Sequence, residues 1–290
     1  MIEYGEIAHD HCLDMFDDST LIFIHELGHY VCARLTQTPM MKFSLGFGKL
    51  LCSCSLQKTP AHLTTEPSYL LCFRGWNKKE FSRIVFAGGF LKRSFLKGLF
   101  FSMGSISWEI RLLPLGGFVD PDLSRDKPRL FRDSLVIIGG PMANFLFALG
   151  LLTICRMQNR DLDFVNAFVS SGESIWDMAV QTFQFILHPF DKSQTNQLMG
   201  PIGIFSIGKE YLSSGWNHIG IFVASLSCAL GLMNALIIPP LDGGRLLFIW
   251  IRAFAPLQGK RLEHAVASIG TISLFFLMIL VAIQDVSRLF

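Results

Sequence analysis

The sequence predicts an all-α polytopic membrane protein with about four transmembrane helices and a small membrane-associated β-loop. Hydrophobic residues make up 51% of the 290 residues, charged residues only 17%, and the mean hydropathy is +0.43. A typical soluble domain carries about 25% charged residues, so this chain is more apolar than a soluble core requires. The net charge is +2, and no basic run interleaved with aromatic residues suggests a nucleic-acid partner. The expected environment is the lipid bilayer.

Four segments are candidate membrane spans, since a span needs roughly 20 predominantly apolar residues. Residues 134–155 contain no charge, residues 219–242 end in Pro-Pro and the sequence LDG, and residues 265–283 are uncharged. The first segment, residues 20–35, is shorter and carries two histidines and a glutamate. On hydropathy alone this first segment is marginal.

The connections between these segments alternate in positive charge. Residues 1–19 hold no Lys or Arg, residues 36–132 hold fifteen, residues 156–218 hold four, and the much shorter 243–264 also holds four. The positive-inside rule therefore predicts an outer acidic N-terminus, an outer connection at 156–218, and cytoplasmic connections at 36–132 and 243–264.

The first connection contains two further features. Residues 84–103 are apolar but carry three basic residues, which predicts an amphipathic segment on the anionic cytoplasmic membrane surface rather than a span. Residues 105–119 predict two short strand segments around the Gly116-Gly117 turn, which form the β-loop.

The chemistry of the first span is carried by the sequence HELGH. His25 and His29 are four residues apart and share one face of a helix, where two imidazoles can bind one Zn²⁺. Glu26 then lies beside the metal and can take a proton from water. A chance HExxH is the alternative, but ionisable groups at membrane depth are costly and indicate function.

A catalytic zinc site usually has three protein ligands, and the third is not obvious. Neither the metzincin nor the thermolysin-like spacing of a third ligand is present. Asp242 is the best candidate, although PLDGG is also good turn chemistry and a turn aspartate is the alternative. The predicted topology places Asp242 and the HExxH residues toward the same, cytoplasmic side of the membrane.

These residues resemble the site-2 protease family of intramembrane zinc metalloproteases, closest to the bacterial RseP-type members. The motifs that carry the resemblance follow the family's order: HELGH (25–29), FSLGFGK (43–49), LPLGGFV (113–119), GGPMANF (139–145), GPIGI (200–204) and NALIIPPLDGGRLLF (234–248). The resemblance implies that His25, His29 and Asp242 bind zinc and that Glu26 is the general base.

The resemblance also implies a substrate-binding role for other residues. The β-loop, with Gly116 and Gly117, matches a segment that pairs with an extended substrate backbone. Asn234 matches an asparagine that contacts the substrate near the zinc, and Asn144 lies in the matching GPxxN element. For both asparagines a hydrogen bond between helices is the alternative.

The chain departs from the family pattern in three places. Acidic residues interrupt the apolar run before HExxH, residues 52–103 resemble an insertion, and residues 156–196 leave no room for a PDZ domain. The family implies regulated intramembrane proteolysis of single-span membrane proteins in the bacterial inner membrane, with the active site toward the cytoplasm. A catalytically inactive homologue that binds transmembrane segments and an ion or proton transporter are the alternatives.

Overall fold

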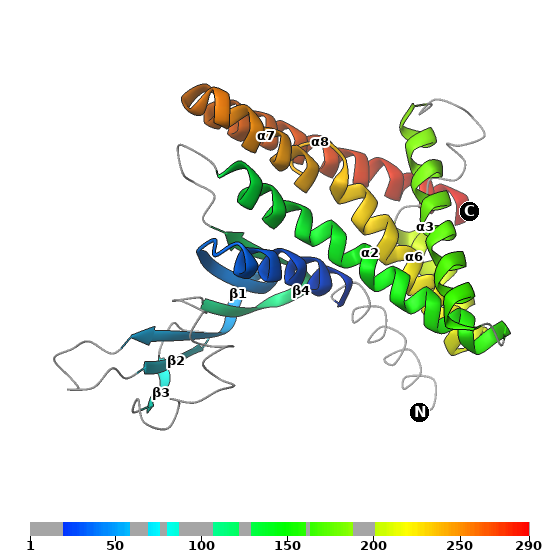
Figure 1. Ribbon diagram of the computed structural model, residues 1–290, viewed down its shortest axis with the longest axis horizontal. Helices are drawn as coiled ribbons and strands as arrows, with labels where there is room; N and C mark the ends of the chain where they lie inside the picture. The colour runs from blue at the N-terminus through cyan, green and yellow to red at the C-terminus, as the bar shows by residue number, and fades with distance from the viewer. Residues whose placement is uncertain are drawn as a thin grey trace. The chain divides into compact units, whose positions relative to one another are not determined.

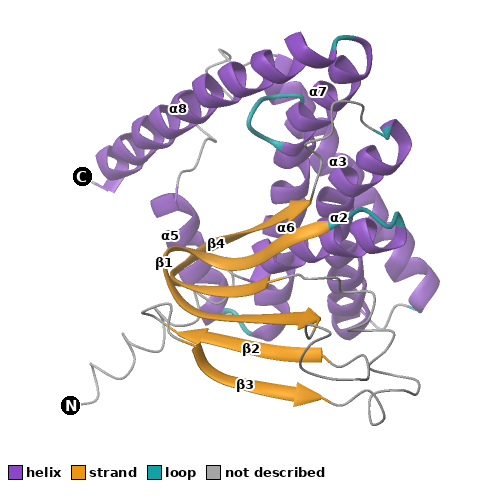
Figure 2. Cartoon of the chain, turned by 90° about the vertical axis from the view of Figure 1, so that its left-hand side faces the viewer, coloured by secondary structure: helices purple, strands orange, loops and turns teal. Residues whose placement is uncertain are grey.

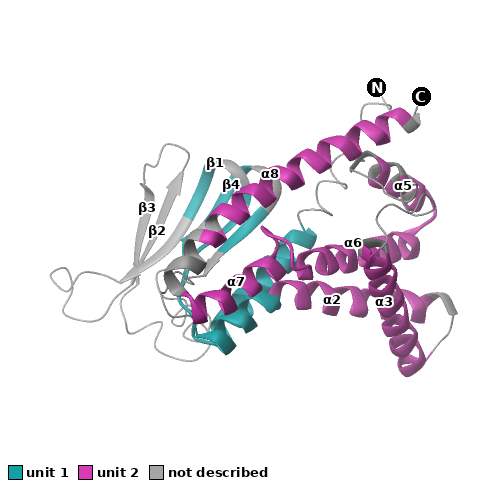
Figure 3. Cartoon of the chain, turned by 90° about the horizontal axis from the view of Figure 1, so that it is seen from above, with its two compact units in different colours: residues 1–139 teal, residues 140–290 magenta. Residues whose placement is uncertain are grey.

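The computed structural model describes residues 20–58, 69–75, 80–86, 107–121, 129–160, 163–187 and 201–289. The chain divides into two compact units, residues 1–139 and residues 140–290, which are coloured separately in Figure 3. The boundary falls within helix α2 (Leu130–Arg160), so α2 contributes its first turns to unit 1 and the rest to unit 2. As the sequence predicts, the protein is mostly helical and has a small sheet (Figure 1).

Unit 1 combines a helix at residues 20–35 with an antiparallel sheet. The sheet has the order β3-β2-β1-β4 and is drawn in Figure 2. Its strands are β1 (Met40–Lys58), β2 (Tyr69–Gly75), β3 (Glu80–Phe86) and β4 (Ser107–Pro121). Residues 107–119 of the predicted β-loop lie within the one strand β4, whereas the sequence predicts two strand segments around a Gly-Gly turn.

Strand β1 bends and pairs with both halves of β4. Residues 40–45 of β1 pair antiparallel with residues 117–121 of β4, and residues 50–55 pair with residues 107–111. Residues 42–45 of β1 also pair with residues 107–110 of β4. Gly46 follows this doubly paired segment, and its φ of 86° is a conformation that suits glycine. The curled sheet therefore places the end of β4 beside the start of β1.

The predicted amphipathic segment 84–103 falls mostly outside the described residues. Its first three residues end strand β3. The predicted insertion, residues 52–103, begins within β1 and supplies both β2 and β3.

The core of unit 1 joins helix 20–35, the sheet and the start of α2. It consists of five buried side chains, from Ala33, Met40, Phe43, Val119 and Val136. Phe23 and Tyr30 of the helix pack edge-on against the Phe43 ring. Burial of this apolar surface fixes the ends of β1 and β4 against the helix that carries HExxH.

Unit 2 is helical. After α2 it contains α3 (Phe164–Leu187), α5 (Pro201–Ser213), α6 (Trp216–Ala235), α7 (Asp242–Phe254) and α8 (Pro256–Leu289). Helices α3 and α5 lie in the predicted outer connection 156–218, and α7 with the first turns of α8 lies in the predicted connection 243–264.

Three helices in the described part of the chain are long and apolar enough to cross a membrane. They cover Leu130–Gln158, Trp216–Ala235 and Ala265–Ser287, and they match the predicted spans at 134–155, 219–242 and 265–283. One boundary differs: α6 ends at Ala235, and Asp242 is the first residue of the next helix. The helix that carries HExxH covers residues 20–35 of the described part of the chain.

Helices α2 and α6 cross closely within unit 2. A Cβ atom at Gly231 of α6 would lie 3.2 Å from Cβ of Asn144 and 3.2 Å from the carbonyl oxygen of Pro141, both on α2. The hydroxyl of Ser227 also donates to the backbone oxygen of Asn144 at 3.1 Å. Small residues and short polar bonds of this kind hold helices together in membranes, where apolar burial alone gives little association.

Candidate metal centre

The two histidines of HExxH converge inside unit 1. His25 and His29 are each 6% exposed, and their Nε2 atoms lie 3.2 Å apart. Two nitrogen ligands at 2.0–2.1 Å from a tetrahedral zinc ion are separated by about 3.3 Å. The spacing of the two nitrogens therefore fits one shared zinc ion.

A backbone carbonyl fixes the orientation of His29. Its Nδ1 lies 2.8 Å from the carbonyl oxygen of Val136 on α2. A carbonyl oxygen can only accept, so Nδ1 carries the proton and, in the neutral ring, Nε2 keeps its lone pair. Such a second partner orients a metal-binding imidazole and raises its basicity.

Gly139 brings α2 close enough for this bond. A Cβ atom at Gly139 would lie 2.6 Å from the carbonyl oxygen of Gly28 and 2.7 Å from Sγ of Cys32. No side chain fits at Gly139, so the backbones of α2 and helix 20–35 meet directly. This explains Gly139, the first glycine of GGPMANF, as a packing residue next to the helix that carries the histidines.

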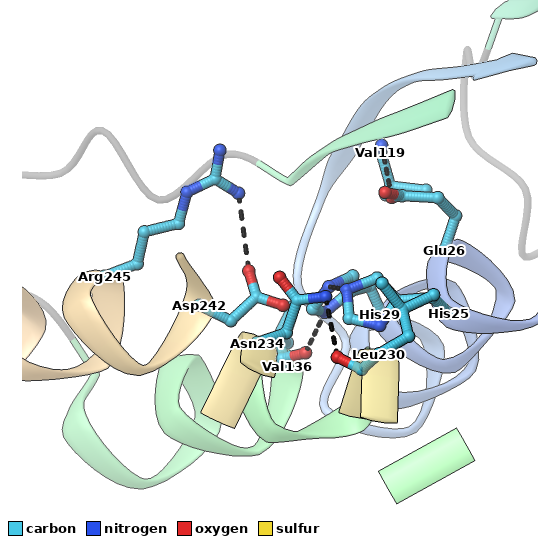
Figure 4. Close-up of polar contacts among 9 residues, drawn as sticks. All are labelled: His25, Glu26, His29, Val119, Val136, Leu230, Asn234, Asp242 and Arg245. Atoms are coloured by element: carbon cyan, nitrogen blue, oxygen red, sulfur yellow. Dashed lines mark hydrogen bonds and ion pairs between the residues drawn. The ribbon is translucent and has the colours of Figure 1, made fainter. Parts of the chain in front are cut away.

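Glu26 points to strand β4. Its Oε2 accepts a hydrogen bond of 2.7 Å from the backbone N–H of Val119, as Figure 4 shows. A Cβ atom at Gly117 would lie 3.6 Å from Cγ of Glu26 and 2.8 Å from the carbonyl oxygen of Ser44. Gly117 is therefore required for the close approach of β4 to β1. Gly116 precedes it on β4.

Asp242 belongs to unit 2, where a tight turn holds it at the start of α7. It is 5% exposed, and its Oδ1 lies 3.7 Å from Nη1 of Arg245 (Figure 4). A Cβ atom at Gly243 would collide with the carbonyl oxygens of Ala235 and Leu236, and one at Gly244 would lie 2.7 Å from the nitrogen of Pro239. The two glycines of LDGG thus let the segment before α7 fold against its first turn.

The two asparagines occupy different environments. Asn144 is fully buried and packs at the crossing of α2 with Gly231 of α6, which favours the packing alternative for this residue. Asn234 lies near the end of α6 and donates from Nδ2 to the carbonyl oxygen of Leu230, one turn earlier, at 3.1 Å (Figure 4). This bond is local to α6.

In unit 1, His25 and His29 offer two nitrogen ligands for a metal ion, and in unit 2 Asp242 offers a carboxylate. All three are buried. Two imidazole nitrogens and a carboxylate are a ligand set that catalytic zinc sites use. The donor types and the spacing of the two histidines therefore fit zinc.

Two polar contacts of this centre involve groups that the sequence does not mark. The carbonyl of Val136 and the N–H of Val119 belong to the backbone, and both residues are buried and apolar. Any residue type supplies these groups, so no pattern of side chains could have indicated them.

A buried HExxH on an apolar helix, beside an edge of a sheet, defines the class of membrane-embedded zinc metallopeptidases. The chain matches the model of peptidase family M50 over residues 19–68 and 70–280. It belongs to this family, which contains the site-2 proteases, and is an intramembrane zinc metalloprotease that acts on membrane proteins. The membership confirms the resemblance that the motifs indicated.

Individual relatives agree with this assignment. FN1322 of Fusobacterium nucleatum, named as a candidate zinc metalloprotease, is 24% identical over 331 residues, which cover 93% of this chain and 96% of that protein. Zinc metalloprotease RasP of Shouchella clausii is 36% identical over 131 residues, 43% of this chain and 29% of that protein. The regulator of sigma-W protease RasP of Bacillus subtilis is 40% identical over 97 residues, 33% of this chain and 23% of that protein. The similarity to the two RasP proteins thus covers less than a third of their length.

Proposed function

We propose that the protein hydrolyses peptide bonds within or near the transmembrane segment of single-span membrane proteins. One zinc ion is held by His25, His29 and Asp242, and Glu26 is the general base. The observation that carries this proposal is the 3.2 Å distance between the buried Nε2 atoms of His25 and His29. The carboxylate of Glu26, the residue after His25, is bound to strand β4.

Each residue has a defined part in the reaction. Zinc, when bound, supplies Lewis acidity toward the scissile carbonyl and toward water. Glu26 accepts the proton of the attacking water and returns it to the departing amine. The carbonyl of Val136 keeps the proton of His29 on Nδ1, so that Nε2 remains available as a ligand.

The substrate segment has to be extended before it can be cut. A helix keeps its carbonyls in backbone hydrogen bonds, so an intact transmembrane helix does not present them to the site. The later part of strand β4, residues 117–121, lies at the edge of the described sheet. We assign the segment around Gly116 and Gly117 as the surface where a substrate strand adds. Asn234 is a further candidate substrate contact.

We place the protein in the bacterial inner membrane, and the charge pattern of the connections supports an orientation with the site toward the cytoplasm. The fifteen Lys and Arg residues of 36–132 and the four of the short 243–264 favour that side. Substrates would then be cut near the cytoplasmic end of their span.

The test uses purified protein in liposomes that contain a single-span substrate protein. Wild type should cut the substrate, and Glu26→Gln should be slower by about 10²-fold or more, because it removes the base but keeps the size of the side chain. Glu173→Gln is the matched control, since Glu173 is exposed on α3, and it should cut at the wild-type rate. Undiminished cleavage by Glu26→Gln would exclude the mechanism.

A further inference from the structure

The side chain of the general base is held by a backbone group of a distant strand. Oε2 of Glu26 accepts a 2.7 Å hydrogen bond from the N–H of Val119, which lies 93 residues later in the sequence. Both residues belong to unit 1, and Figure 4 shows the bond. The proposed reaction uses the carboxylate of Glu26 but does not by itself explain this contact.

The bond to Glu26, together with the pairing of β4 with β1, shows in which direction the Val119 N–H points. Residues 117–121 of β4 pair antiparallel with residues 40–45 of β1, with Val119 opposite Phe43. In such a pair, residues alternate between directing both backbone polar groups at the partner strand and directing both away. Because the N–H of Val119 donates to Glu26, Val119 directs its polar groups away from β1.

This side of β4 is the sheet edge. In the described sheet β4 follows β1 at the end of the strand order. An extended peptide that adds to the sheet there would lie along the same side as the carboxylate of Glu26. The hydrogen bond thus holds the base in line with the edge where a substrate strand would lie.

The strand that supplies this N–H is itself firmly placed. The side chain of Val119 is 7% exposed and packs in the core of unit 1 with Phe43 and Val136. Gly117 approaches Glu26 from the same strand, since a Cβ atom at Gly117 would lie 3.6 Å from Cγ of Glu26. The donor is therefore rigid, whereas an unanchored glutamate side chain has several rotamers.

From these contacts we infer that the backbone N–H of Val119 is the positioning group of the general base. It fixes one carboxylate oxygen of Glu26 at the substrate edge of β4, and so sets the direction in which the carboxylate meets the attacking water. The inference rests on the proposed role of Glu26 and adds a consequence: one strand both holds the substrate and aligns the base.

The test removes the N–H and keeps the strand. Val119→Pro has no N–H, and proline is accepted on an edge strand where that group points away from the ladder. Val119→Ala is the matched control, because it loses buried side-chain atoms but keeps the N–H. Cleavage of the single-span substrate in liposomes gives kcat and KM, and metal analysis gives the zinc content of each variant.

Val119→Pro should lower kcat by about 10²-fold, as expected for a catalytic group displaced by about 1 Å, with KM and zinc content near wild type. Val119→Ala, which keeps the N–H, should lower kcat far less than Val119→Pro does. An unchanged kcat in Val119→Pro would overturn the inference. A raised KM with unchanged kcat would also overturn it, since the N–H would then serve substrate binding alone.

A second measurement does not depend on catalysis or on the folding of the proline variant. Amide hydrogen exchange of the peptide that covers residues 117–121 reports the Val119 N–H. Glu26→Ala should lose the protection of one amide in this peptide, whereas Glu26→Gln, which keeps an oxygen acceptor, should retain it. Equal exchange in the two variants would contradict the contact. If the wild type shows no zinc-dependent cleavage, the proposed function fails, and the exchange result still decides whether β4 holds Glu26.

Discussion

At the scale of single residues, the centre depends on glycines as much as on its ligands. Gly139 lets α2 approach helix 20–35, Gly117 lets β4 approach β1, and Gly243 lets the chain turn tightly into α7. HELGH and LDGG predict the polar residues, because His, Glu and Asp in an apolar setting are unusual. The role of the adjacent glycines is not predictable from spacing, since it depends on which backbone lies opposite each one.

Gly243→Ala should therefore displace Asp242 without changing any polar group. The added Cβ would collide with the carbonyl oxygens of Ala235 and Leu236, and such overpacking costs about 1–3 kcal/mol of the free energy of unfolding. We expect lower thermal stability in detergent and lower zinc content. The matched control is Gly172→Ala on α3, where a Cβ meets no atom within 4 Å and where alanine favours the helix. Equal zinc content in both variants would show that the turn does not position Asp242.

At the scale of elements, hydrogen bonds connect helices of unit 2 where the burial of apolar side chains does not. Asp285 of α8 is 4% exposed, and its Oδ2 accepts a 2.9 Å bond from the N–H of Gly203 in the first turn of α5. The carboxylate satisfies a backbone donor that the helix leaves unpaired and faces the positive end of its dipole. The motif GPIGI is thus explained as the start of a capped helix.

Asp285→Ala should destabilise the contact between α5 and α8. Loss of a side chain that caps a helix costs about 0.5–2 kcal/mol, which lowers the midpoint of thermal unfolding by a few degrees. Glu210→Ala, which removes an exposed carboxylate from the same helix, is the control and should leave the midpoint unchanged. The proposed role of Asp285 fails if the two variants unfold at the same temperature.

Hydropathy alone predicts the long helices, but it predicts neither the sheet nor the residue at which α6 ends. The spans at Leu130–Gln158 and Ala265–Ser287 are long and nearly uncharged, so their composition alone indicates them. Strands β2 and β3 lie in a stretch without a clear alternating pattern, and pairing with β1 defines them. The helix ends at Ala235 rather than at Asp242 because the segment before α7 packs against Gly243 and Gly244, a contact that hydropathy cannot reveal.

At the scale of the whole molecule, the proposed metal ligands lie on two compact units. His25 and His29 lie in unit 1 with the sheet that we assign to the substrate, and Asp242 lies in unit 2 with the three-residue sequence LDG at the start of α7. In the proposed mechanism one zinc ion binds all three residues. Zinc binding would then also stabilise the protein, since metal binding contributes to the stability of the structure that holds it. This shared site is the central claim of the proposed mechanism.

The zinc content of the purified protein tests this claim most directly. Wild type and Glu26→Gln should each hold one zinc ion per chain, because Glu26 is a base and not a ligand. His25→Ala and Asp242→Ala should each lose most of the metal, since each removes one of three protein ligands. Full zinc content in Asp242→Ala, or loss of zinc in Glu26→Gln, would contradict the proposed site.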